Sequence, residues 1–170
     1  EKLRDEHGWT IGQDGQHFRR TVPSPRPRRI LELGVIRLLL DQGVVVICAG
    51  GGGIPVVARP DGTMIGVEAV IDKDHASGLL ARALKADAYL MLTDVEGVFQ
   101  NWGTPAQTRI TEAKPETMRL GEYPAGSMGP KVEAACDFVD ATGGFASIGR
   151  LCDTLGLIEG TCGTRIARAR

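Results

Sequence analysis

Residues 44–55 read Val-Val-Val-Ile-Cys-Ala-Gly-Gly-Gly-Gly-Ile-Pro, the most informative segment of the sequence. Its first half, residues 44–49, is apolar and rich in β-branched side chains, which predicts a strand buried on both faces. The glycines that follow, Gly50, Gly51, Gly52 and Gly53, allow positive φ and let a ligand approach the backbone closely. Gly-rich loops at the carboxyl ends of parallel strands bind phosphates in α/β folds, so we expect an anion there. The alternative is a flexible turn without a ligand.

Strands and helices alternate along the rest of the chain. We expect helices near residues 30–43, 74–85 and 128–143, a hairpin over 56–65, buried strands at 88–92 and 145–148, and an edge strand at 164–166. This order predicts an α/β fold with a mainly parallel sheet and helices on both faces, a three-layer α/β/α sandwich.

The first 29 residues differ in composition from the remainder, and we expect two parts, 1–29 and 30–170. Prolines at positions 23, 25 and 27 impose an extended path on the backbone and exclude a helix. Five arginines lie nearby, at positions 19, 20, 26, 28 and 29. They are compatible with a solvated linker or a nucleic-acid arm, but no aromatic residues alternate with them, which disfavours nucleic acid.

Composition excludes several classes of protein. The formal net charge is −1 over 170 residues, so no global field attracts nucleic acid or an anionic membrane. No apolar run approaches 18 residues, and the first residues lack the apolar core of a signal peptide, so we expect a cytoplasmic location. The four cysteines and three histidines show no metal-site spacing, and we expect free thiols and no protein-held metal.

Two lysines lie at the starts of predicted helices, where the positive end of the helix dipole disfavours a cation. Lys73 stands between Asp72 and Asp74, either of which could cap the helix. Lys131 follows Ser127, which we expect to be the cap of its own helix. A bound phosphate would resolve the unfavourable placement of both lysines, whereas plain helix caps and surface lysines are the alternative.

The segment after the strand at 88–92 reads Thr93-Asp94-Val95-Glu96-Gly97-Val98-Phe99. Open α/β sheets bind ligands at such strand ends, while a simple strand-to-loop turn is the alternative. Two acids two positions apart on a loop are a weak metal signal, so we do not assign Asp94 or Glu96 to Mg²⁺.

Several segments together resemble the carbamate kinases of the amino acid kinase family. They are residues 19–25, 46–56, 66–74, 125–135 and 163–164, which follow in order and at suitable spacing. A Gly-Gly-Asn-Ala-type turn and a His-Gly-Asn-Gly-type loop, which that family carries earlier in its chain, do not occur here. The resemblance therefore implies the carboxyl-terminal half of the family's chain.

This resemblance implies a reaction that interconverts ATP and carbamate with ADP and carbamoyl phosphate, with Mg²⁺, in a cytoplasmic homodimer of arginine metabolism. It implies that Lys73 and Lys131 contact phosphoryl groups, that Asp74 orients the lysines, and that the four glycines bind phosphoryl and carbamate oxygens. It further implies that residues 1–29 end a small protruding subdomain. The residues that it assigns to the nucleotide are Thr93, Asp94, Val95, Gly126, Ser127 and Met128.

Gly149-Arg150 departs from the family, which usually has a Thr-Ser pair there, and this puts part of the nucleotide rim in doubt. Other amino acid kinases that phosphorylate a carboxylate, a nucleotide-binding remnant without catalysis, and an inert fragment remain as alternatives.

Overall fold

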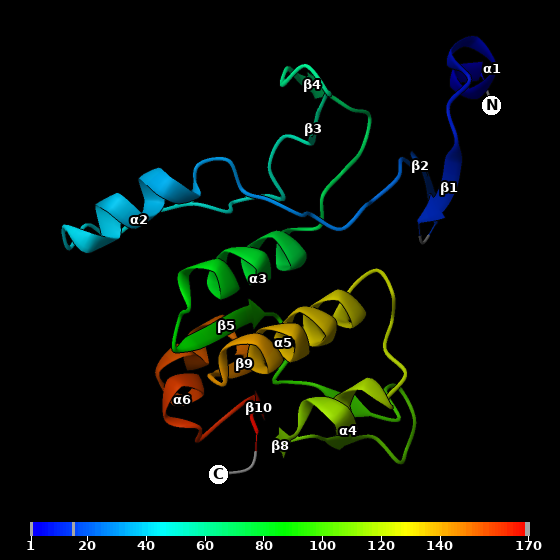
Figure 1. Cartoon of the computed structure of the whole chain (residues 1–170). Helices are drawn as coiled ribbons and strands as arrows, with labels where there is room; N and C mark the ends of the chain where they lie inside the picture. Colours follow the sequence, from blue (N-terminus) through cyan, green and yellow to red (C-terminus); the bar gives the residue numbers. More distant parts are fainter. Residues whose placement is uncertain (1, 15, 169–170) are drawn as a thin grey trace.

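The computed structural model describes residues 2–14 and 16–168. Its amino-terminal part holds the helix α1 (Lys2–His7) and an antiparallel hairpin of β1 (Ile11–Asp14) and β2 (His17–Arg20). Residues 21–30 then follow an extended path without helix or strand, as the alternating prolines predict. Figure 1 shows this hairpin at the edge of the molecule, joined to the remainder by the extended linker.

A four-stranded sheet forms the centre of the molecule, in the order β5, β9, β10, β8. Its strands are β5 (Ala88–Thr93), β9 (Phe145–Arg150), β10 (Thr164–Ile166) and β8 (Glu112–Ala113). Strand β9 pairs parallel with β5 and antiparallel with β10, and β10 pairs parallel with β8. The prediction of an edge strand at 164–166 is therefore wrong, because β10 has a partner on each side.

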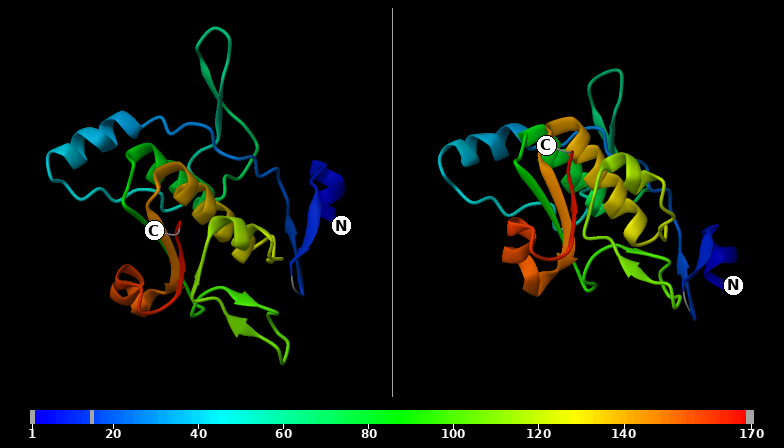
Figure 2. Two further views of the ribbon diagram at one scale, coloured as in Figure 1. Left: turned by 60° about the horizontal axis from the view of Figure 1, so that its bottom comes forward. Right: turned by 90° about the horizontal axis from the view of Figure 1, so that it is seen from below.

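Helices cover both faces of this sheet. The helices α3 (Lys73–Leu84) and α5 (Met128–Thr142) lie on one face, where Ala146 and Ile148 of β9 join a core with Phe138. Between them in sequence, Ser147 points to the opposite face, and its hydroxyl donates to the Leu157 carbonyl of α6 (Thr154–Glu159) at 3.0 Å. The three-layer α/β/α architecture is confirmed, and Figure 2 shows α6 on the side of the sheet away from α3 and α5.

The predicted main helices begin and end at recognisable signals. Asp72 caps α3, and Lys85 ends it in a left-handed conformation. Helix α5 ends at Gly143, whose φ of 72° suits a residue without Cβ. Helix α2 (Leu33–Asp41) ends before Gly43, and the Arg37 guanidinium donates to the Ala83 carbonyl in α3.

Smaller elements connect this framework. They are the hairpin of β3 (Val56–Ala58) and β4 (Met64–Gly66), the hairpin of β6 (Phe99–Gln100) and β7 (Thr108–Arg109), α4 (Pro115–Arg119), and the 3₁₀ helix η1 (Leu151–Asp153). The β3–β4 hairpin matches the one predicted at 56–65 and projects away from the core in Figure 2.

The predicted buried strand at 44–49 is wrong. These residues form neither helix nor strand, and the Val45 and Ile47 side chains are 90% and 98% exposed. A strand needs a neighbouring strand for its backbone hydrogen bonds, and within the described residues none of the paired strands takes up this segment. Its composition nevertheless is that of a buried strand, although none of the strands among residues 2–14 and 16–168 pairs with it.

Candidate functional site

A cavity of about 440 Å³ opens where β5 ends and where α3 and α5 begin. Carboxyl ends of parallel strands and amino-terminal ends of helices meet at the ligand edge of an α/β sheet. The lining residues are Asp72, Lys73, Asp74, Thr93, Asp94, Val95, Gly97, Phe99, Trp102, Glu122, Tyr123, Pro124, Gly126, Ser127, Met128 and Lys131. Apart from the four glycines, every residue that the sequence assigned to the site lines this cavity. These nine residues are Lys73, Asp74, Thr93, Asp94, Val95, Gly126, Ser127, Met128 and Lys131.

Asp74 pairs with both helix-start lysines. Its Oδ2 lies 2.7 Å from Nζ of Lys131 and 3.9 Å from Nζ of Lys73. The Asp74 and Lys131 side chains are only 11% and 12% exposed, whereas that of Lys73 is 60% exposed. The Lys131 ammonium is therefore held in the cavity wall by a close ion pair, whereas the Lys73 ammonium is more exposed and farther from the same carboxylate.

The capping of α3 explains why Asp74 is available for this role. The Asp72 carboxylate accepts hydrogen bonds from the backbone N–H groups of Asp74 at 2.8 Å and His75 at 3.0 Å. This resolves the alternative that the sequence left open, because Asp72 is the cap and the Asp74 carboxylate is left to the lysines.

Tyr89 supports Asp74 from the core side. Its hydroxyl donates to the Asp74 carbonyl at 2.9 Å, and its ring packs edge-on against Phe138 at 5.7 Å between centroids. Burial raises the pKa of Tyr89, and the nearby negative charge of Asp74 adds to this effect. The phenol therefore stays a hydrogen-bond donor at neutral pH and fixes the backbone of Asp74.

The start of α5 differs from the expectation for Ser127. Ser127 holds the cap position, but its side chain makes no capping hydrogen bond. The turn is closed by the backbone, since the N–H groups of Ser127 and Gly129 donate to the Pro124 carbonyl at 3.2 and 2.9 Å. The first turn of α5 is thus without a side-chain acceptor, which suits it for an anion that enters the cavity.

Aromatic side chains line another part of the cavity, and the sequence reasoning did not identify them. The rings of Phe99 and Trp102 lie 5.3 Å apart at 58° to each other, and Trp102 is 58% exposed. The backbone of Asn101, just before Trp102, has a φ of 52°, which marks a tight loop. Phe99 at the end of the Thr93–Phe99 loop and Trp102 shortly after it were the signal that could have indicated a surface for a planar ring.

The four glycines do not line the cavity. Gly50, Gly51 and Gly53 are exposed, while Gly52 packs so closely on Ile71 that a Cβ would collide with the Ile71 carbonyl. Ile71 directly precedes Asp72, so this loop touches the segment that leads into the site. The predicted contact of these glycines with phosphoryl oxygens has no counterpart in the cavity that the described residues form.

The acids of the 93–99 loop have protein partners. Asp94 accepts from the Thr93 hydroxyl at 3.0 Å, and Glu96 pairs with Arg150 at 3.2 Å. Arg150, one of the two residues that depart from the family pattern, also binds Asp153 at 2.9 Å. Within residues 2–14 and 16–168, no group of three or more His, Cys, Asp or Glu side chains could hold a metal ion.

The sequence model of the Amino acid kinase family matches residues 5–145. The carbamate kinase of Rhizobium meliloti (strain 1021) is 54% identical over 98% of this chain, and that of Haemophilus influenzae is 48% identical over 99%. Among solved structures, a carbamate kinase from Giardia lamblia bound to AMP-PNP is 42% identical, with a TM-score of 0.88 over 99% of this chain.

The chain spans about half the length of these relatives, with 52% of the R. meliloti protein, 54% of the H. influenzae protein and 54% of the G. lamblia chain covered. All four cysteines are free thiols, as expected. In the part of the chain that the structure describes, no helix is both long enough and apolar enough to cross a membrane.

Proposed function

Because this chain belongs to the amino acid kinase family, we propose that it is the nucleotide-binding part of a carbamate kinase-like phosphotransferase. The reaction is the interconversion of ATP and carbamate with ADP and carbamoyl phosphate. The observation that carries the proposal is the cavity in which one buried carboxylate, Asp74, holds two lysines at the starts of two helices.

Phosphoryl transfer requires positioning and positive charge more than a covalent nucleophile. Lys131 supplies a fixed ammonium at the start of α5, and Lys73 supplies an exposed one that can follow the transferred group. Asp74 sets the distance between them by pairing with both. Arranging these charges before the substrate arrives lowers the reorganisation that the transition state requires.

The nucleotide has suitable partners in the same cavity. Thr93, Asp94, Val95, Gly126, Ser127 and Met128 line it, as do the aromatic rings of Phe99 and Trp102. We place the phosphates beside the lysines and the first turn of α5, and the base against the aromatic rings. The G. lamblia relative bound to AMP-PNP supports a nucleotide as the ligand.

Mg²⁺ belongs to this proposal as a companion of the nucleotide. The ion keeps several waters and binds phosphate oxygens together with one or two carboxylates. Asp94 and Glu122 line the cavity and are the acids available beyond the Asp72–Asp74 segment. When bound, Mg²⁺ neutralises phosphate charge. Homodimer formation and a cytoplasmic location complete the proposal, on the resemblance to the family.

A second candidate is a nucleotide-binding protein without catalysis. It is favoured by the exposed glycine loop and by the segment 44–49, which is not paired in a sheet. The glycines therefore do not contribute to the cavity that the described residues form. Misplacement of reacting groups by about 1 Å can cost on the order of 100-fold in rate. We therefore expect the chain to bind nucleotide more readily than it turns over substrate.

A coupled assay of ATP formation from carbamoyl phosphate and Mg-ADP separates the two candidates. The chain is assayed alone and after addition of a polypeptide that supplies the remaining half of a relative. We expect little turnover from the chain alone and restored turnover from the mixture, because the second polypeptide completes the acceptor wall. Absence of turnover in the mixture, with nucleotide binding intact, favours the non-catalytic candidate. Acetate and N-acetylglutamate in place of carbamate in the reverse direction test other acceptors.

A further inference from the structure

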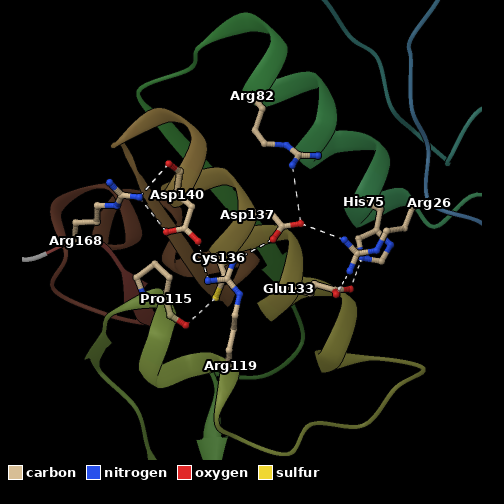
Figure 3. Close-up of polar contacts among 10 residues, drawn as sticks. All are labelled: Arg26, His75, Arg82, Pro115, Arg119, Glu133, Cys136, Asp137, Asp140 and Arg168. Atoms are coloured by element: carbon tan, nitrogen blue, oxygen red, sulfur yellow. Dashed lines mark hydrogen bonds and ion pairs between the residues drawn. The ribbon is translucent and has the colours of Figure 1, made fainter.

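The outward side of α5 carries three carboxylates, Glu133, Asp137 and Asp140. Their spacing of four and three residues places them on one face of the helix. Each of them contacts arginine or histidine side chains from other segments, as Figure 3 shows. These partners are Arg26 of the linker, His75 and Arg82 of α3, Arg119 of α4, and Arg168 after β10.

Glu133 occupies the end of this row that is next to the cavity. Its Oε2 lies 2.9 Å from Nε2 of His75, and its Oε1 pairs with the Arg26 guanidinium. His75 directly follows Asp74, and Glu133 stands two residues after Lys131. The His75–Glu133 contact therefore joins the same two helix starts as the Lys131–Asp74 pair. Unlike Lys131 and Asp74, these two residues do not line the cavity.

The two helices touch closely enough for this contact to control their alignment. A Cβ on Gly78 of α3 would lie 3.3 Å from the Ala134 Cβ of α5, so the helices meet with little space between them. This packing sets how far apart the helices lie. Polar contacts between α3 and α5 then set their alignment, and besides Lys131–Asp74 they include Arg82–Asp137 at 3.9 Å and His75–Glu133 at 2.9 Å. The His75–Glu133 contact is directional and resists a shift of one helix start along the other.

Arg26 extends the arrangement to the linker. Besides Glu133, its guanidinium reaches Asp137, with Nη1 3.4 Å from Oδ2. The neighbouring Pro23 carbonyl accepts a hydrogen bond from the Val70 N–H at 3.0 Å, just before the segment that leads into α3. The linker is thus fastened both to α5 and to the approach to α3, and Glu133 is the residue shared with His75.

We propose that Arg26, Glu133 and His75 act as a positioning triad, which fixes the start of α5 against the start of α3 and so keeps the Lys131 ammonium on Asp74. The triad also makes the placement of Lys131 depend on the linker that carries the β1–β2 hairpin. Its effect on ligand binding rests on the proposed function, whereas its effect on Lys131 does not.

The alternative is that the whole row only stabilises the fold, and the far end of the row provides the control. Asp140 sits on the same helix face and pairs with Arg119 at 2.7 Å and Arg168 at 3.3 Å, but it touches neither His75 nor Arg26 in the described structure. Asp140→Ala removes comparable ion pairs and leaves the triad intact. A purely structural role predicts the same consequences for Glu133→Ala and Asp140→Ala.

The environment of Lys131 can be observed directly in the full chain. Reductive methylation with ¹³C-formaldehyde retains the charge of each lysine, and Lys131→Arg assigns its signal in the NMR spectrum. Without nucleotide, we expect Glu133→Ala and His75→Ala to shift the Lys131 signal toward that of exposed lysines. Glu133→Gln should keep the original position because its amide still reaches both partners, and Asp140→Ala should leave the signal unchanged.

Mg-ADP affinity gives a second measurement. Coupling between neighbouring groups of this kind predicts a loss of roughly fivefold to tenfold for Glu133→Ala and no change for Asp140→Ala. An unshifted Lys131 signal in Glu133→Ala overturns the proposal. If that variant does not fold, His75→Ala and Arg26→Gln decide in the same way. A shifted signal in a chain that binds no Mg-ADP leaves the triad standing and rejects the proposed function instead.

Discussion

At the scale of single residues, Asp74 is the carboxylate that both helix-start lysines share. An acidic residue beside a helix start is ordinarily a cap, and the sequence alone could not separate Asp72 from Asp74. The structure assigns the cap to Asp72 and leaves the Asp74 carboxylate to Lys131 and Lys73. The lysines could be predicted because each stands at an unfavourable helix end. Their sharing of one carboxylate depends on how α3 and α5 pack, which local sequence does not encode.

Trp102 offers a direct optical test of the aromatic part of the cavity. It is one of two tryptophans in the chain, and the other, Trp9, is stacked with His7 in the amino-terminal part. If the base stacks on Trp102, Mg-ADP should quench tryptophan fluorescence in the chain and in Trp9→Phe. Trp102→Phe should lose the quenching but retain binding, and Trp102→Ala should bind more weakly by about 1–3 kcal/mol. Quenching that persists in Trp102→Phe contradicts this placement of the base.

At the scale of elements, the helices α3 and α5, the strands β5 and β9 and the β3–β4 hairpin could be predicted from local pattern, because caps, apolar stripes and turn residues lie within each segment. The structure of segment 44–49 could not be predicted in this way. Its apolar pattern is typical of a buried strand, but the pattern does not show whether a neighbouring strand is present to pair with it. The interior position of β10 was missed for a related reason: its partner β8 is a strand of two residues, too short to show a period.

The glycine loop provides a matched pair of substitutions. A Cβ at Gly52 would collide with the Ile71 carbonyl, whereas a Cβ at Gly51 would meet nothing within 4 Å. Gly52→Ala should therefore displace the approach to Asp72 and weaken Mg-ADP binding in calorimetry. Gly51→Ala should bind like the parent chain. Equal loss in both variants would instead support a direct contact between the loop and phosphoryl oxygens.

The carboxyl-terminal end of the α5 row should make stability depend on acid pH. Burial alone would raise the pKa of Asp140, but hydrogen bonds from Arg119 and Arg168 lower it below its usual value of 3.8. A carboxyl whose pKa is depressed in the folded state contributes stability above its unfolded pKa and loses it as pH falls through the folded pKa. Urea unfolding should show Asp140→Asn less stable than the parent near pH 7. The difference should shrink as the pH falls below 3.8 and through the lowered pKa of folded Asp140, and a constant difference would contradict the assignment.

At the scale of the whole molecule, one side of the chain is a built α/β core and the other is exposed apolar surface. Val45, Ile47 and Ile54 are almost fully exposed, and Leu38 and Val35 of α2 are largely so. These side chains belong to α2 and to the segment around the glycine loop, and they lie outside the core that α3, α5 and the sheet form. The cavity at the starts of α3 and α5 is nevertheless formed, whereas the glycine loop lies outside it.

Calorimetry with Mg-ADP measures directly whether this chain carries a nucleotide site built on Lys131 and Asp74. Lys114, an exposed lysine at the start of α4 and outside the cavity, provides the control. We predict binding to the parent chain and to Lys114→Ala, and a loss of about 1.5–3 kcal/mol in Lys131→Ala, the value of one charge-assisted contact. Equal affinity of the parent chain and Lys131→Ala for Mg-ADP would show that Lys131 does not belong to a nucleotide site.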